Sequence, residues 1–176
     1  TDPPTLEDAP LRPATLPNCR SRQGQFLSNL RNPPMMSFES LALGTTTQFT
    51  IGTMAVDLTG SIQVLSQPTS TYYGVYPTEG DRCLFQFSNP SFTMNFASPI
   101  IALGFMGTDI GDGGASLLLS LHRTDGTTQN IVVPNSKSAP GSNPNISGSA
   151  LFFGIIDAGH PFTAVTFANP NSFLDG

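Results

Sequence analysis

The sequence predicts an all-β protein, a jelly-roll-like antiparallel β-sandwich with an extended, proline-rich N-terminal arm. Only 11% of the residues are charged, and 17 Gly and 16 Pro supply many turns, a composition unlike that of a helical protein. After residue 36, short apolar or alternating runs recur between turn residues, as strands do in a sandwich. With 176 residues, one domain can bury its own core.

The arm is expected over residues 1–35 and the β-sandwich domain over residues 36–176. "TDPPTLEDAPLRPATLPNC" and "NPPMM" are broken by prolines and show no sustained period, so an extended or irregular backbone is expected instead of a helix. The arm has little core of its own, with scattered apolar residues such as Leu11, Leu16, Phe26 and Leu30.

Twelve apolar or alternating runs are the expected strands of the sandwich. They are residues 38–43, 49–51, 54–58, 62–65, 72–76, 83–87, 92–96, 100–106, 117–123, 131–133, 151–156 and 164–167. In "FTMNF" every second residue is apolar, which predicts a half-buried strand joined by a tight "ASP" turn to the run Ile100 to Met106. A second hairpin is expected at Asp125-Gly126, a dipeptide that two-residue turns favour.

Composition narrows the classes of partner. The chain has a net charge of -5 and its only lysine is Lys137, so no basic patch is available for a nucleic-acid backbone. No apolar run reaches the roughly 20 residues of a membrane-spanning helix. We therefore expect neither nucleic-acid binding nor a membrane span.

Cys19 and Cys83 show no CxxC spacing, which argues against a zinc site. A disulfide between them is the favoured prediction, because it would tie the arm to the body in a protein whose composition suits export. Two buried thiols are the alternative. Asn145 begins an Asn-Ile-Ser sequon, a glycosylation site only if the source organism glycosylates.

No catalytic residues are predicted, and the chain is expected not to be an enzyme. It contains no G-x-S-x-G nucleophile elbow. His122 lies on the strand face opposite the leucines and is expected to point to solvent. His160 precedes a proline in a turn, where a loop role is the ordinary interpretation.

The stretch "GFMGTDIGDGG", residues 104–114, is a candidate metal loop. Its spacing does not fit an EF-hand loop that begins at Asp109. The third position would be Gly111 and the twelfth Ser120, where an EF-hand needs an oxygen ligand and a glutamate. Carboxylates of Asp109 and Asp112, with carbonyls of a glycine-rich loop, suit calcium. The alternative is that both aspartates cap turns by hydrogen bonds to the backbone.

Several segments resemble a known family. "MSFESLALGTTTQFTIGTMAVDLTG", "YGVYPTEG", "ALGF-x-GTDIGD" and "LFFGIID-x-x-x-PFTAVTF" resemble the β-sandwich domain of exported bacterial proteins of the PEP-CTERM sorting class, and the similarity covers roughly residues 36–173. The resemblance implies a jelly-roll-like, secreted or cell-surface module without assigned activity. It also implies a structural calcium, for which Glu39 in "SFES" matches the first-strand ligand.

Family members continue with a final strand of the "FGFDD" kind, whereas this sequence stops at Gly176. A sandwich without that strand would expose unpaired backbone groups and an open groove. The arm of the same or a neighbouring copy is expected to fill the groove, which predicts a self-assembling extracellular subunit whose partners are copies of itself. The alternative is that the natural chain extends beyond Gly176.

A second functional prediction is a carbohydrate-binding module on a calcium-stabilised jelly roll, with an extracellular polysaccharide as its partner. Sugar-binding surfaces present exposed aromatic side chains, and the candidates here are Tyr72, Tyr73 and Tyr76. These tyrosines would alternatively pack within a strand.

Overall fold

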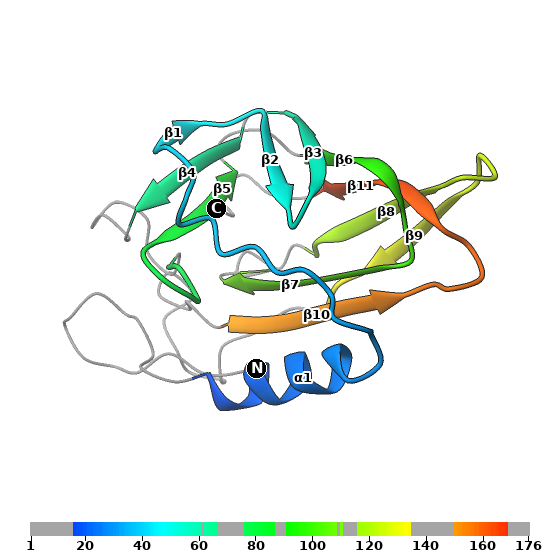
Figure 1. Cartoon of the computed structure of the whole chain (residues 1–176), viewed down its shortest axis with the longest axis horizontal. Helices are drawn as coiled ribbons and strands as arrows, with labels where there is room; N and C mark the ends of the chain where they lie inside the picture. Colours follow the sequence, from blue (N-terminus) through cyan, green and yellow to red (C-terminus); the bar gives the residue numbers. More distant parts are fainter. Residues whose placement is uncertain are drawn as a thin grey trace.

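The structure is a computed structural model that describes residues 16–60, 62–66, 76–86, 91–108, 110, 116–134 and 150–168. Antiparallel β-sheets pack against each other, which confirms the all-β sandwich (Figure 1). The elements are α1 (Pro17–Leu27), β1 (Gly44–Thr45), β2 (Gln48–Ile51), β3 (Met54–Thr59), β4 (Ile62–Ser66), β5 (Arg82–Gln86), β6 (Ser91–Ile100), β7 (Ala102–Thr108), β8 (Leu118–Arg123), β9 (Thr128–Val132), β10 (Ala150–Ile156) and β11 (Phe162–Ala168).

The described strands form three hydrogen-bonded groups. The largest is a six-stranded sheet in the order β2-β3-β6-β11-β8-β9. A second group pairs β10 with β7, and a third has the order β1-β4-β5. Figure 1 shows β7 and β10 across from the six-stranded sheet, with α1 running alongside β10.

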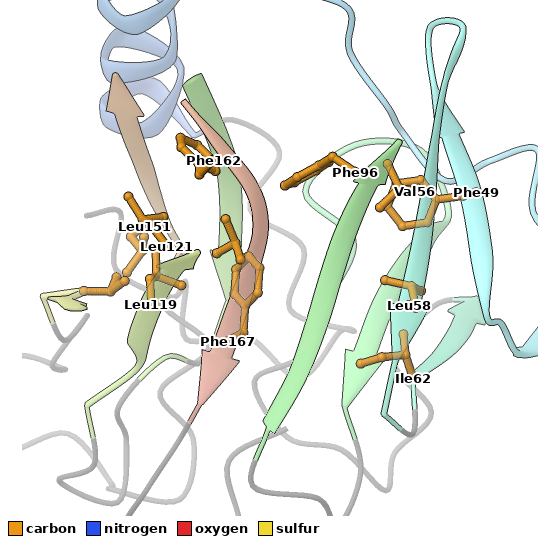
Figure 2. Close-up of a cluster of buried hydrophobic side chains, with 12 residues drawn as sticks. Phe49, Val56, Leu58, Ile62, Phe96, Leu119, Leu121, Leu151, Phe162 and Phe167 are labelled. Carbon is orange, nitrogen blue, oxygen red and sulfur yellow. The ribbon is translucent and has the colours of Figure 1, made fainter. Parts of the chain in front are cut away.

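The core lies between the sheets and is built by alternation. On β11, Val165 and Phe167 point inward and are buried, whereas Thr166 between them faces outward. Figure 2 shows Phe162 and Phe167 between the leucines of β8 and β10 and the apolar residues of β2, β3 and β4. Each large apolar side chain buried in this way stabilises the fold by about 1.5–3 kcal/mol.

The hairpin predicted at Asp125-Gly126 is confirmed. It joins β8 to β9, and Gly126 has a φ of 83°, a conformation that glycine adopts without a steric cost. Asp125 Oδ1 accepts hydrogen bonds from the Thr127 amide at 2.9 Å and the Thr127 hydroxyl at 2.7 Å. These bonds to Thr127 lower the pKa of Asp125. Asp125 is therefore a turn residue, as expected.

The hairpin predicted across "ASP" is wrong. β6 pairs with β3 and β11, whereas β7 pairs with β10, so the chain crosses from one sheet to the other near Ile101. β6 extends past the pattern "FTMNF" to Ile100 because its far end still pairs with β11, where Phe162 lies opposite Ile100. The β3 pairing ends at Phe96, so Pro99 removes no donor on that side.

Two further expectations need correction. The arm is not extended throughout, because residues 17–27 form α1. Pro17 begins this helix, at a position where its missing N–H costs nothing. The run 38–43 is not a strand: Leu41 N donates to Phe38 O at 3.0 Å in a turn, and Phe38 has a positive φ of 65°. Residues 1–15 and most of residues 72–76 lie outside the described residues.

Candidate functional site

A groove with a volume of about 520 Å³ runs between α1 and β10. One wall is a single stripe of the helix, with polar residues spaced by three or four positions, and the other wall is β10. The lining residues are Asn18, Cys19, Arg22, Gln25, Phe26, Asn29, Pro134, Leu151, Phe152, Phe153, Gly154 and Ile156. This groove is the candidate functional site.

Two glycines explain how the helix approaches the strands so closely. Gly104 of β7 and Gly154 of β10 are directly opposite each other, and Phe26 of α1 lies over both. A Cβ placed on Gly154 would meet Phe26 Cδ2 at 2.5 Å, and one on Gly104 would meet Phe26 Cε1 at 2.8 Å. Phe26 also contacts Phe152, with ring centroids 5.5 Å apart.

The first turn of α1 is anchored at the beginning of β10. Cys19 is 1% exposed, and its thiol donates to Ala150 O at 3.3 Å. Leu16, Tyr76 and Ala150 complete this small buried cluster, and Met106 and Phe152 pack against it. The helix therefore runs in the same direction as β10, with Cys19 beside Ala150 and Phe26 over Gly154.

The outer edge of β10 belongs to the second wall of the groove. Among the strands that the structure describes, β10 pairs only with β7. Its sequence, ALFFGII, has seven residues with neither a charge nor a proline, two features that commonly protect an edge strand. Ile156 adds apolar surface, because this residue is 44% exposed. This edge is chemically able to add another strand.

The outer face of the six-stranded sheet carries a second feature, a row of polar side chains over five strands. Thr93 and Thr166 hydroxyls are 2.8 Å apart, and His122 Nε2 lies 2.9 Å from the Thr166 hydroxyl. Further along, Ser120 donates to Asn130 at 2.7 Å and Asn95 donates to the Thr59 hydroxyl at 3.1 Å. His122 therefore belongs to this outer face, as expected, but is half-buried among hydroxyl groups instead of fully solvated.

His160 lies in the turn between β10 and β11, beside an ion pair. Asp157 Oδ2 accepts from Arg123 at 2.7 Å, and Asp157 Oδ1 lies 3.0 Å from His160 Nδ1. The hydrogen bonds to His160 and Arg123 hold the pKa of Asp157 below its usual value. Because His160 N also donates to Asp157 O at 3.2 Å, the cluster closes the turn and gives His160 the predicted loop role.

Glu39, the predicted calcium ligand, lies in a turn and not on a first strand. Its Oε1 accepts hydrogen bonds from the backbone amides of Asp81 and Arg82, both at 2.7 Å, and Arg82 in turn donates to Leu41 O. Glu39 thus fastens the turn at residues 38–41 to the beginning of β5. Within the described part of the chain, no three His, Cys, Asp or Glu side chains gather as a possible metal site.

The predicted disulfide is wrong for this structure, in which both cysteines are thiols. Cys19 is held in the contact between α1 and β10, whereas Cys83 lies on β5 in the three-stranded group. The helix is the physical reason, because it places Cys19 in a local buried cluster instead of on an extended tether. Burial raises the pKa of the Cys83 thiol to about 11.

The remaining predicted site residues divide into two groups. Tyr76 is 3% exposed, so its predicted contact with a glycan is wrong: its ring packs against Leu16 and Cys19 in the cluster beneath α1. Tyr72, Tyr73, Asp109, Asp112 and Asn145 lie outside the described residues, and their roles stay predictions.

The sequence contained a signal for the helical wall that proline content hid. Residues 18–27 are free of proline and rich in Arg and Gln, which favour helices. Cys19 and Phe26 are seven positions apart, the spacing of two turns on one helix face.

Comparison with protein families, with curated proteins and with solved structures found no match. No helix among the described residues is long and apolar enough to cross a membrane.

Proposed function

We propose that this chain is a non-enzymatic structural subunit or surface module of the bacterial cell exterior that assembles with copies of itself. The observation that supports this function best is the outer edge of β10, a seven-residue apolar strand with one hydrogen-bonded neighbour among the described strands. Unprotected edges of this kind template the addition of a further strand. The location outside the cell rests on the resemblance to exported PEP-CTERM-class domains.

Strand donation by the arm is part of this proposal, but only a part of the arm is the donated segment. Residues 17–27 are helical and wall the groove, so they are not the donated strand. Assembly is tested by sedimentation velocity and negative-stain electron microscopy of the purified chain over a hundredfold range of concentration. Oligomers or filaments that grow with concentration are expected, and a monomer at every concentration would contradict self-assembly.

A carbohydrate-binding module is the second candidate, favoured by the polar row on the six-stranded sheet. Hydroxyl, amide and imidazole groups from β3, β6, β11, β8 and β9 lie side by side there, and such groups bind sugar hydroxyls. Affinity electrophoresis in a panel of polysaccharides tests this function. Thr166→Val should abolish any retardation, whereas Thr45→Val on β1 should not. Retardation that is equal in both variants would exclude the polar row.

Calcium belongs to this second candidate as a structural ion. A bound metal stabilises the folded state by mass action, so EDTA should lower the melting temperature and added calcium should restore it. A melting temperature that EDTA leaves unchanged would remove calcium from the proposal.

A further inference from the structure

We propose that the groove between α1 and β10 binds residues 1–15 of a second copy of this chain, added as a strand to the outer edge of β10. This inference rests on the proposed self-assembly and deepens it by naming the surface and the segment that meet. The contact joins different surfaces of two copies, so repetition of it produces an open, head-to-tail filament.

The strand edge supplies the backbone part of the binding site. In β-strand addition, main-chain hydrogen bonds provide affinity, and side-chain pockets provide specificity. β10 offers such an edge along residues 151–156, and the exposed Ile156 offers apolar contact at its end. A strand added here would gain the helix as a wall on one side.

The helix supplies the specific part. Asn18, Arg22 and Gln25 of α1 are spaced four and three positions apart, so they form one stripe along the groove, and Asn29 in the turn after the helix continues it. All four are exposed. Arg22 donates to Gln25 at 3.1 Å and brings the stripe a positive charge. The wall therefore suits an extended acidic segment.

Residues 1–15 have the matching chemistry. TDPPTLEDAPLRPAT contains three acidic residues, Asp2, Glu7 and Asp8, against one basic residue, Arg12. Its prolines are compatible with an added outer strand, because N–H groups on the solvent side of an edge need no partner in the sheet. The proline-free stretch TLEDA carries both apolar and acidic side chains.

Chain direction favours a second copy over the same chain as the donor. α1 and β10 run in the same direction, and Leu16 lies in the cluster at the beginning of β10. Residues 1–15 of the same chain would have to reverse direction immediately before Pro17 to enter the groove. A segment from a neighbouring copy enters without this reversal.

Complementation between two full-fold variants tests the proposal. One variant lacks residues 1–15 and keeps the groove; the other, Ile156→Lys, keeps residues 1–15 and places a charge in the groove. Each alone should be monomeric by sedimentation velocity. Their mixture should form a one-to-one heterodimer and nothing larger, because only one donor and one acceptor remain.

Matched control variants distinguish the loss of binding in the groove from the general effect of a new charge on the surface. Leu43→Lys alters a 55% exposed apolar residue outside the groove and should assemble like the wild type. Arg22→Glu should weaken assembly by about three- to tenfold, and Arg31→Glu should not. Combining Arg22→Glu with Glu7→Lys and Asp8→Lys should restore assembly. Circular dichroism and thermal melts check that every variant is folded.

Each contrary outcome has a distinct meaning. A monomeric wild type contradicts self-assembly itself. If the wild type assembles and either the truncated chain or Ile156→Lys assembles equally well, this inference is overturned. Self-assembly itself would then still hold. If the wild type is monomeric and a synthetic peptide of residues 1–15 binds the truncated chain in fluorescence anisotropy, the groove is filled by its own chain and the second copy is excluded.

Discussion

The six-stranded sheet and the β7–β10 pair enclose the same core but differ on their outer faces. The six-stranded sheet turns hydroxyl and amide groups to the outside, where the Thr166 hydroxyl contacts both Thr93 and His122. β10 is apolar along its whole length, which is typical of a strand buried on both faces. Its outer face needs a cover, and α1 provides it from more than a hundred residues away in the sequence.

This difference separates two properties of the β7–β10 pair, the covering of its outer face and the pairing of its outer edge. α1 covers the face of the β7–β10 pair through Phe26 on Gly104 and Gly154, but it leaves the strand edge of β10 accessible in the groove. Covering the face and pairing the edge are separate requirements. Side chains cover a face, whereas the unpaired N–H and C=O groups of an edge need hydrogen-bond partners. Variants of each region test the comparison.

Phe162→Ala should produce the largest loss of stability. Phe162 is fully buried and packs edge-to-face with Phe96, with ring centroids 6.4 Å apart. Removing a buried phenyl ring leaves a cavity and should lower the free energy of unfolding by about 3–5 kcal/mol, as measured by urea denaturation. Ile101→Ala, at a position 44% exposed, should change it by less than about 0.5 kcal/mol. Equal losses in both variants would contradict this view of the core.

The shared core was the predictable part of the fold. Alternation placed Phe96 and Leu119 on buried faces, and Asp125-Gly126 predicted the β8–β9 turn, because these signals act over a few residues. The crossover at Ile101 was not predictable in this way. A tight turn between two apolar runs fits a hairpin and a change of sheet equally well, and only pairing with β10 and β11 distinguishes them.

The candidate groove was missed because its walls are distant in the sequence. In the sequence-based prediction, the prolines around residues 17–27 outweighed the weak helical signal of this segment. The apolar side chains that α1 turns toward β10 are little more than Cys19 and Phe26. Glu39 was predicted to bind a metal, whereas its carboxylate accepts hydrogen bonds from the backbone amides of residues 81 and 82. No local pattern identifies such a partner.

Gly154→Ala should disturb the helix and spare the six-stranded sheet. The added methyl group would meet Phe26 at 2.5 Å, so α1 must shift, at a cost of about 1–3 kcal/mol. Hydrogen exchange should accelerate in residues 17–27 and remain unchanged in β8 and β11. Gly24→Ala is the matched control: nothing lies within 4 Å of the position that its methyl group would take, so it should stabilise α1 by about 0.5–1 kcal/mol. Faster exchange in β8 with Gly154→Ala would contradict independent roles of the two regions.

Asp157→Asn should reveal a pH-dependent contribution of the β10–β11 turn. Hydrogen bonds from His160 and Arg123 lower the pKa of Asp157 in the folded state, so the carboxylate stabilises the fold above its unfolded pKa of about 3.9. That contribution is lost as the pH falls through the folded pKa. The wild type should therefore melt higher than Asp157→Asn near pH 6, and the gap should close toward pH 2. Asp57→Asn, an exposed carboxyl on β3, is the control, and a gap that stays constant with pH would contradict the ionic role.

Thiol labelling has the smallest expected effect on stability, because it changes no residue. It checks the environments of the two cysteines directly. Burial raises the pKa of Cys83 to about 11, so only about one thiol in a thousand is ionised at pH 8, and the thiolate is the reactive form. Native protein should therefore react slowly with iodoacetamide, and the rate at Cys83 should rise about tenfold per pH unit. In urea without reductant, mass spectrometry should find both Cys19 and Cys83 alkylated. A chain that accepts label only after reduction would contain the disulfide, and its Cys19 would have to leave the α1–β10 contact to form it.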